Sequence, residues 1–254
     1  MTDLAMGRGG AFDIGRVVER TFGVIGANFL TMVGLALLLS ALPQSLAALG
    51  APPRLDGAPD FSPIRLIGSL VAAIGAFVLQ SAVVHASIVD LNGGKANFAD
   101  SLRTGLRHFW PVVAISILMT FAVVFGSFLL LVPGVMMAVA WVVAVPVRVV
   151  ENKGIFASFS RSAELTRGSR WGIFGLFFVY ILLAMLLGLL GGVFVGAIVG
   201  ITGGANSIGA RAVISPIFNA LASMVGASGA AAIYYELRSK KEGVAPQELA
   251  AVFD

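Results

Sequence analysis

The stretch PVRVVENKGIFASFSRSAELTRGSRW, residues 146–171, decides how this sequence is organised. It is a short polar bridge between two long apolar runs, and two weaker copies of the pattern occur elsewhere in the chain. Its charged residues are Arg148, Glu151, Lys153, Arg161, Glu164, Arg167 and Arg170. Apolar runs that alternate with short charged bridges are typical of a protein that crosses a membrane several times.

Composition supports this interpretation. Of the 254 residues, 58% are hydrophobic and 12% are charged, whereas soluble domains average about 25% charged residues. A soluble fold of this size could not cover so much apolar surface, so lipid must be the solvent for much of it. The chain has no cysteine, which excludes disulfides and thiolate ligands. Its net charge of +4 does not indicate a nucleic-acid partner, because the positive residues flank the apolar runs.

Six membrane spans are predicted, and one apolar run has to contain two of them. No charged residue lies between Pro111 and Val147, yet a single helix of that length would extend roughly 55 Å across a hydrocarbon core of about 30 Å. Val132-Pro133-Gly134 is the natural turn. The predicted spans are 28–50, 66–90, 110–131, 134–150, 171–199 and 212–235, in one membrane domain of residues 12–243. Residues 1–11 are predicted to be flexible, and 244–254 to form a cytoplasmic tail.

The distribution of Lys and Arg predicts the orientation. With the N-terminus in the cytoplasm, that side holds 14 of the 17 Lys and Arg residues. The other side holds only Arg54, Arg65 and Arg211. Because the Lys and Arg bias sets membrane orientation, both termini are predicted to be cytoplasmic, in the inner membrane of a bacterium.

The spans form three repeated units. Each unit has a basic amphipathic segment, a span, an outer loop, and a second span that ends at an acidic residue, and the units begin near Phe12, Phe98 and Phe156. Short amphipathic helices of this kind usually lie in the headgroup plane. The predicted fold is an all-α, polytopic membrane helical bundle of six transmembrane helices, arranged as three hairpins with short cytoplasmic amphipathic helices.

The fifth span carries a stripe of small residues. Gly188, Gly192, Gly196 and Gly200 recur at every fourth position, and such a face lets a second helix backbone approach closely in a membrane. The favoured interpretation is packing against the last span, 212–235, which has small residues at the same interval. Association of two copies of the chain is the alternative.

Three segments resemble a known family. They are FDIGRVVERTFGVIGANF (12–29), AVPVRVVENKGIFASFSRSAELTRGSRW (144–171) and IYYELRSKKEG (233–243). Together they are similar to the glycerophosphoryl diester phosphodiesterase membrane-domain family, whose bacterial members have about six membrane helices. In some members this domain is fused to a catalytic barrel, which needs roughly 250 residues. No barrel is present in this chain, so the resemblance implies no activity.

Catalytic chemistry is not predicted either. Phosphodiester hydrolysis would need paired carboxylates for a divalent metal and histidines for acid–base work, and no Asp or Glu lies in mid-span. The chain is therefore expected not to be an enzyme and to need no cofactor or metal. His85, with Gln80 nearby and Asn219 in the last span, is a candidate intramembrane polar site. Structural hydrogen bonding is the favoured alternative for these residues.

The cationic residues of the polar bridges are candidate contacts for lipid headgroups, because each Lys or Arg near an anionic leaflet contributes about 1 kcal/mol. Orientation and anchoring alone are the alternative. The predicted function is a non-enzymatic membrane protein that binds or organises lipid, or serves as a membrane module for a partner. A small transporter or channel for a lipid-like amphiphile is the alternative function. The candidate headgroup contacts are Arg161 and Arg167 first, then Arg170, Arg103 and Arg107.

Overall fold

The structure is a computed structural model that describes residues 12–50, 63–201 and 207–242. The predictions for 1–11, for most of the loop at 51–63 and for the tail at 244–254 lie outside the described residues. The described part of the chain forms helices and no strand. Six of its segments are long and apolar enough to cross a membrane: Phe29–Gly50, Leu66–Leu91, Phe109–Phe128, Val132–Glu151, Arg170–Ile201 and Gly209–Glu242. The predicted all-α bundle of membrane-spanning helices is confirmed.

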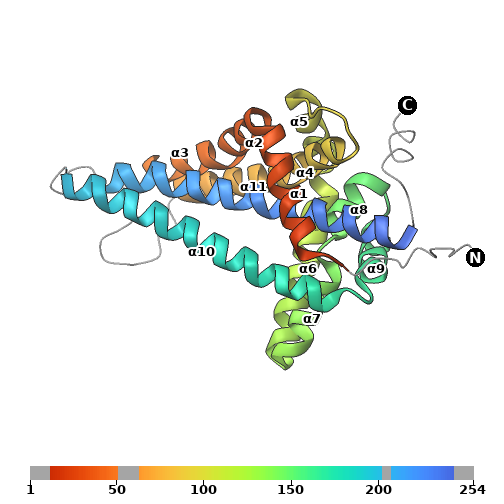
Figure 1. Ribbon diagram of the computed structural model, residues 1–254. Coiled ribbons are helices and arrows are strands. Elements are labelled where there is room, and N and C mark those ends of the chain that lie inside the picture. The colour runs from red at the N-terminus through yellow and green to blue at the C-terminus, as the bar shows by residue number, and fades with distance from the viewer. Residues whose placement is uncertain (1–11, 51–62, 202–206, 243–254) are drawn as a thin grey trace, which may run out of the picture.

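The spans pair as three antiparallel hairpins (Figure 1). In the first, α2 (Phe29–Ala36), η1 (Leu37–Ala41) and α3 (Leu42–Gly50) form one span, which packs on α4 (Pro63–Leu91). The second pairs α6 (Phe109–Leu129) with α7 (Leu131–Trp141), which leads into α8 (Ala144–Glu151). The third pairs α10 (Arg170–Ile201) with α11 (Ser207–Glu242). The first and third hairpins pack together through α4 and α11, while the α6–α7 hairpin points away from the α10–α11 pair.

The second hairpin turns earlier than predicted. The break falls at Leu130, which is extended, and Pro133 and Gly134 lie in the first turn of α7. Proline fits there because the first N–H groups of a helix have no intrahelical partner. Gly134 is needed for packing, since a Cβ at this position would lie 2.7 Å from the backbone nitrogen of Ser127 in α6.

Three short amphipathic helices complete the repeat, and they connect the hairpins in a ring. They are α1 (Ile14–Ala27), α5 (Phe98–Arg107) and α9 (Ile155–Thr166). Each packs mainly on the returning span of the preceding unit: α5 on α4, α9 on α7 and α8, and α1 on α11, which closes the ring. In Figure 1, α1 crosses α11 near the C-terminal end of α11, which carries its charged residues. This end of the bundle is called the charged end below. These helices are thus part of the bundle and do not lie free on its surface.

The glycine stripe of the fifth span faces outward. Gly188, Gly192, Gly196 and Gly200 are exposed, and a Cβ added at any of them meets nothing within 4 Å. The face of α10 that packs on α11 instead includes Gly191, which lies against Phe218. The predicted packing of the stripe on the last span is therefore wrong. The fourfold spacing identifies a smooth helix face, but the larger side chains on the neighbouring face make the contacts with α11.

Candidate lipid-contact surface

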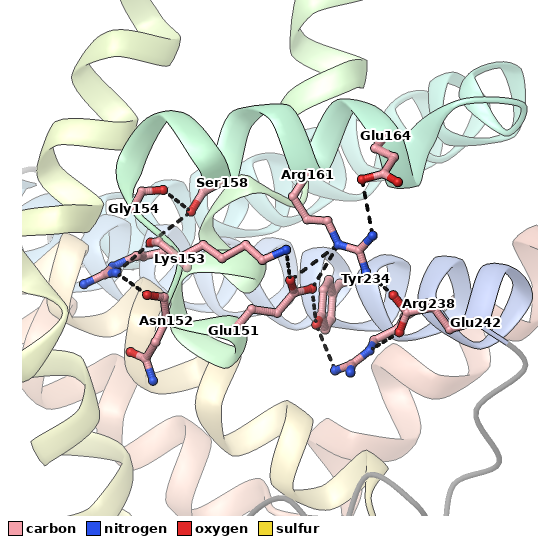
Figure 2. Close-up of polar contacts among 11 residues, drawn as sticks. Glu151, Asn152, Lys153, Gly154, Ser158, Arg161, Glu164, Tyr234, Arg238 and Glu242 are labelled. Atoms are coloured by element: carbon pink, nitrogen blue, oxygen red, sulfur yellow. Dashed lines mark hydrogen bonds and ion pairs between the residues drawn. The ribbon is translucent and has the colours of Figure 1, made fainter.

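The joint between α8 and α9 is an ion-pair cluster around Glu151 (Figure 2). This carboxylate ends α8, and Lys153 Nζ lies 2.9 Å and Arg161 Nε 3.4 Å from it. The hydroxyl of Tyr234, on α11, donates a hydrogen bond to Glu151 over 2.9 Å. The turn that follows Glu151 is closed by Arg148, whose guanidinium donates to the carbonyls of residues 152 and 153. The cluster therefore joins the end of one repeat to the start of the next and to α11.

Arg161 is the centre of this cluster, and its role differs from the predicted headgroup contact. Besides Glu151, it forms ion pairs with Glu164 on its own helix and with Glu242 at the end of α11. Burial lowers the pKa of the guanidinium, but the hydrogen bond to Glu242 and the charge of Glu151 outweigh it and raise the pKa overall. Arg161 is thus a fixed cation that three carboxylates share, and it has little capacity left for a phosphate.

The joint between α1 and α11 uses the same chemistry. Arg16 and Arg20 on α1 both form ion pairs with the buried Glu236 of α11. The guanidinium of Arg20 also lies 5.0 Å from the centre of the Tyr235 ring, which is a favourable cation–π distance. Asp13 caps α1 by accepting the backbone N–H of Arg16, and this bond lowers the pKa of the Asp13 carboxyl. Two arginines of α1 are thus paired with one carboxylate of α11, although Arg16 itself remains exposed.

The third joint, between α4 and α5, contains no ion pair among the described residues. Asn28, in the turn between α1 and α2, donates from Nδ2 to Asp90 Oδ1 over 2.6 Å, so the acidic residue near the end of α4 is paired with a neutral amide. Gly105 lies so close to α4 that a Cβ would be 2.7 Å from the carbonyl oxygen of Val78. Arg103 and Arg107 are exposed on the opposite face of α5 and pair with no described carboxylate.

Exposed apolar side chains flank these two arginines. Leu106 is 59% exposed and Trp110, at the start of α6, is 76% exposed. Tryptophan is enriched at membrane–water interfaces because its ring is apolar and its N–H is polar. The patch of Arg103, Leu106, Arg107 and Trp110 therefore has the composition of a surface that contacts lipid headgroups.

The turn from α9 to α10 holds the two remaining candidate cations. Arg167 is exposed, and the half-buried Arg170 has its Nε atom buried with no hydrogen-bond partner. Lys240 and Lys241 of α11 reach the same turn, where they donate to the Ser169 hydroxyl and to the backbone carbonyl of Glu164. Trp171, which follows directly, is almost fully exposed. This turn is a second cationic region at the same end of the bundle.

The candidate intramembrane polar site is not assembled. His85 Nδ1 lies 3.4 Å from the hydroxyl of Ser101 on α5, while Gln80 is half-buried and Asn219 is exposed. No hydrogen bond in the described part of the chain joins any two of these three predicted residues. His85 contributes instead to the α4–α5 joint, which agrees with the structural alternative.

An apolar cavity of about 200 Å³ lies between α1, α10 and α11. No pattern in the sequence predicts this cavity. Its lining includes Thr21 from α1, Tyr180 from α10, and Gly226, Gly229 and Ala230 from α11. The small residues of α11 were visible in the sequence, but the crossing of α1 over them joins segments about 200 positions apart, and no local pattern shows that contact.

Comparisons with known proteins do not identify a family for this chain. A scan against protein-family models, a search of curated proteins and a search of solved structures each return no match to this chain. In the described residues, no group of three His, Cys, Asp or Glu side chains is placed to hold a metal ion.

Proposed function

We propose that this protein is a non-enzymatic, multi-pass membrane protein that binds anionic lipid at its charged end, in the leaflet that the Lys and Arg bias makes cytoplasmic. The observation that carries the proposal is the difference between the three amphipathic helices. On α1 and α9 the arginines are paired with carboxylates, whereas Arg103 and Arg107 on α5 are exposed without such a partner. A cation pair beside an exposed Trp110 is suited to lipid phosphates at the interface.

Transport of a lipid-like amphiphile is the alternative function, and the arrangement of polar side chains favours it less. A transport path needs polar groups that line a cavity across the bilayer. Gln80, His85 and Asn219 are in different surroundings, and none of them lines the cavity beside α1. The resemblance to the phosphodiesterase membrane domain is compatible with either function, because it concerns the membrane domain alone.

The test is the lipid that the purified protein retains. The full chain would be equilibrated in mild detergent with equal amounts of phosphatidylglycerol and phosphatidylcholine, washed extensively, and analysed by mass spectrometry. We expect wild type to prefer phosphatidylglycerol, and we expect the double variant Arg103→Gln/Arg107→Gln to weaken the binding of this lipid at the α5 patch roughly 30-fold, since each charge contributes about 1 kcal/mol.

Arg211→Gln is the control, because this exposed cation lies on α11 far from the charged end. It should keep the preference of wild type. A wild-type protein without any preference for phosphatidylglycerol, or a double variant indistinguishable from wild type, would exclude the proposed function.

A further inference from the structure

We infer that the cavity between α1, α10 and α11 is a binding site for one hydrocarbon chain of a phospholipid whose phosphate lies beside Arg170. This inference names a second, tighter lipid site and rests on the proposed function only in taking membrane lipid as the ligand. The site is separate from the α5 patch, so the two can be tested independently.

The size of the cavity fits part of a chain. An apolar cavity of about 150 Å³ is enough to bind a benzene molecule, and this one has a volume of about 200 Å³. It is kept open by α11, where Gly229 and Ala230 present almost no side chain to it. A Cβ at Gly229 would meet only the hydroxyl of Thr21, at 4.0 Å. The space is therefore a consequence of small residues beneath the crossing helix α1.

The two hydroxyl groups in the lining already donate their protons to backbone carbonyls, so the lining offers a polar ligand no free side-chain donor. Thr21 Oγ1 already donates to the carbonyl of Val17 over 2.7 Å, and the Tyr180 hydroxyl donates to the carbonyl of Ala222 over 3.4 Å. The other lining side chains are apolar. A buried water needs two to four polar partners, so water is a poor occupant and hydrocarbon is a good one.

The cavity opens toward lipid. Its rim includes Phe22, which is 49% exposed, and Val179 and Tyr180, which are 43% and 36% exposed. On α10 the lining runs from Ile173 to Leu183, within about 20 Å of the start of the helix at 1.5 Å per residue. The opening is thus in the leaflet at the charged end, where a lipid chain can enter sideways.

Arg170 supplies the charge that a phospholipid requires. It lies three residues before Ile173, on the same face of α10, and Ile173 lines the cavity. Its Nε is buried and donates to no acceptor in the described residues. The side chain as a whole is half-buried, so a phosphate beside its accessible part would be paired with the guanidinium charge while the chain below it fills the cavity.

The experiment is native mass spectrometry of the full chain in mild detergent, after incubation with dioleoyl phosphatidylglycerol and, separately, with oleic acid. We expect one phosphatidylglycerol per chain in the Arg103→Gln/Arg107→Gln background, where the α5 patch does not contribute, and each variant below is made in that background. Gly229→Leu should lower this occupancy at least tenfold by filling the cavity, and Arg170→Gln should lower it about fivefold through the lost charge. Gly229→Ala should retain the lipid, because its methyl group fits.

Two further variants make the result decisive. Gly188→Leu adds the same side chain on the outer face of α10, where nothing lies within 4 Å, and should bind like the parent double variant. Val179→Trp blocks the rim without altering α11 and should lose the lipid even if Gly229→Leu fails to fold. Retention by both Gly229→Leu and Val179→Trp, or binding of oleic acid but not of the phospholipid, overturns the inference. Arg103→Gln/Arg107→Gln should leave this single lipid in place, so failure here differs from failure of the proposed function.

Discussion

The α8–α9 joint and the α4–α5 joint occupy equivalent places in the repeat but are held by different interactions. At α8–α9, Glu151 meets the cation Arg161, and the joint is a network of charges. At α4–α5, Asp90 near the end of α4 accepts from the neutral amide of Asn28, which lies between α1 and α2, and α4 and α5 themselves approach through Gly105. Arg103 and Arg161 both lie five residues after the phenylalanine that starts their repeat, yet only Arg161 is paired with carboxylates.

The difference shows how a repeated unit can acquire a separate function. Where close backbone packing holds a joint, the arginine is not needed for stability and is free to contact another molecule. Where an ion pair holds the joint, the arginine is committed to the fold. The α5 joint is therefore the part of the ring at which lipid recognition conflicts least with stability.

The largest expected effect on stability comes from removing Arg161, the cation that three carboxylates share. Arg161→Gln leaves Glu151, Glu164 and Glu242 without it, and because Arg161 is only 17% exposed we expect a loss of about 3 kcal/mol in the free energy of unfolding. The matched variant Arg103→Gln should change it by less than about 0.5 kcal/mol. Unfolding of both variants in the same detergent measures the difference, and equal losses would contradict the comparison.

A smaller effect on stability is expected from changing Gly105, through which α5 packs closely on α4. In Gly105→Ala, the new methyl group would lie 2.7 Å from the carbonyl oxygen of Val78, which is backbone and cannot rotate away. We expect a loss of about 2 kcal/mol. Gly188→Ala is the control, since it meets nothing and removes a helical glycine, which is favourable by roughly 0.5–1 kcal/mol. If Gly105→Ala were as stable as Gly188→Ala, close packing would not be what holds α5.

The smallest effect on stability is expected from removing the amide of Asn28. Asn28→Ala removes the hydrogen bond to Asp90 and also the acceptor of the Ala96 backbone N–H. The free energy of unfolding should therefore fall by about 1.5 kcal/mol. Thr31→Val is the comparison, because it removes only a 3.5 Å bond to the same loop. The midpoint of thermal unfolding should fall for Asn28→Ala and hardly move for Thr31→Val.

The fold could be predicted from the sequence because its signals are local. Hydrophobic run length gives the six spans, and the missing charge between Pro111 and Val147 requires a turn between two of them. Asn97 is a local signal of the same kind, because Asn is a favoured residue directly before a helix, and its side chain accepts the backbone N–H of Ala99. The acidic residue at the end of each returning span was visible too, although its partner was not.

The partners could not be predicted because they depend on contacts between distant segments. Arg161 and Arg103 occupy the same place in their repeats, and the contacts that separate their roles include one to Glu242, which is 81 residues away from Arg161. The face of α10 that meets α11 includes Gly191 and not Gly188, and this rotation depends on where α11 lies. The cavity requires α1 and α11 to be placed first, so it has no sequence pattern of its own.

The closure of the ring by α1 and α11 also sets an order of events during synthesis. Arg20 and Glu236 are 216 residues apart, and a ribosome that adds about 5–20 residues per second needs roughly 10–40 s to make the second after the first. During that interval α1 lacks its main contact, α11, although α2, α4 and α10 also pack on it and are made earlier. We therefore expect α1 to lie partly in the headgroup plane until α11 is complete, and to reach its final place late in assembly.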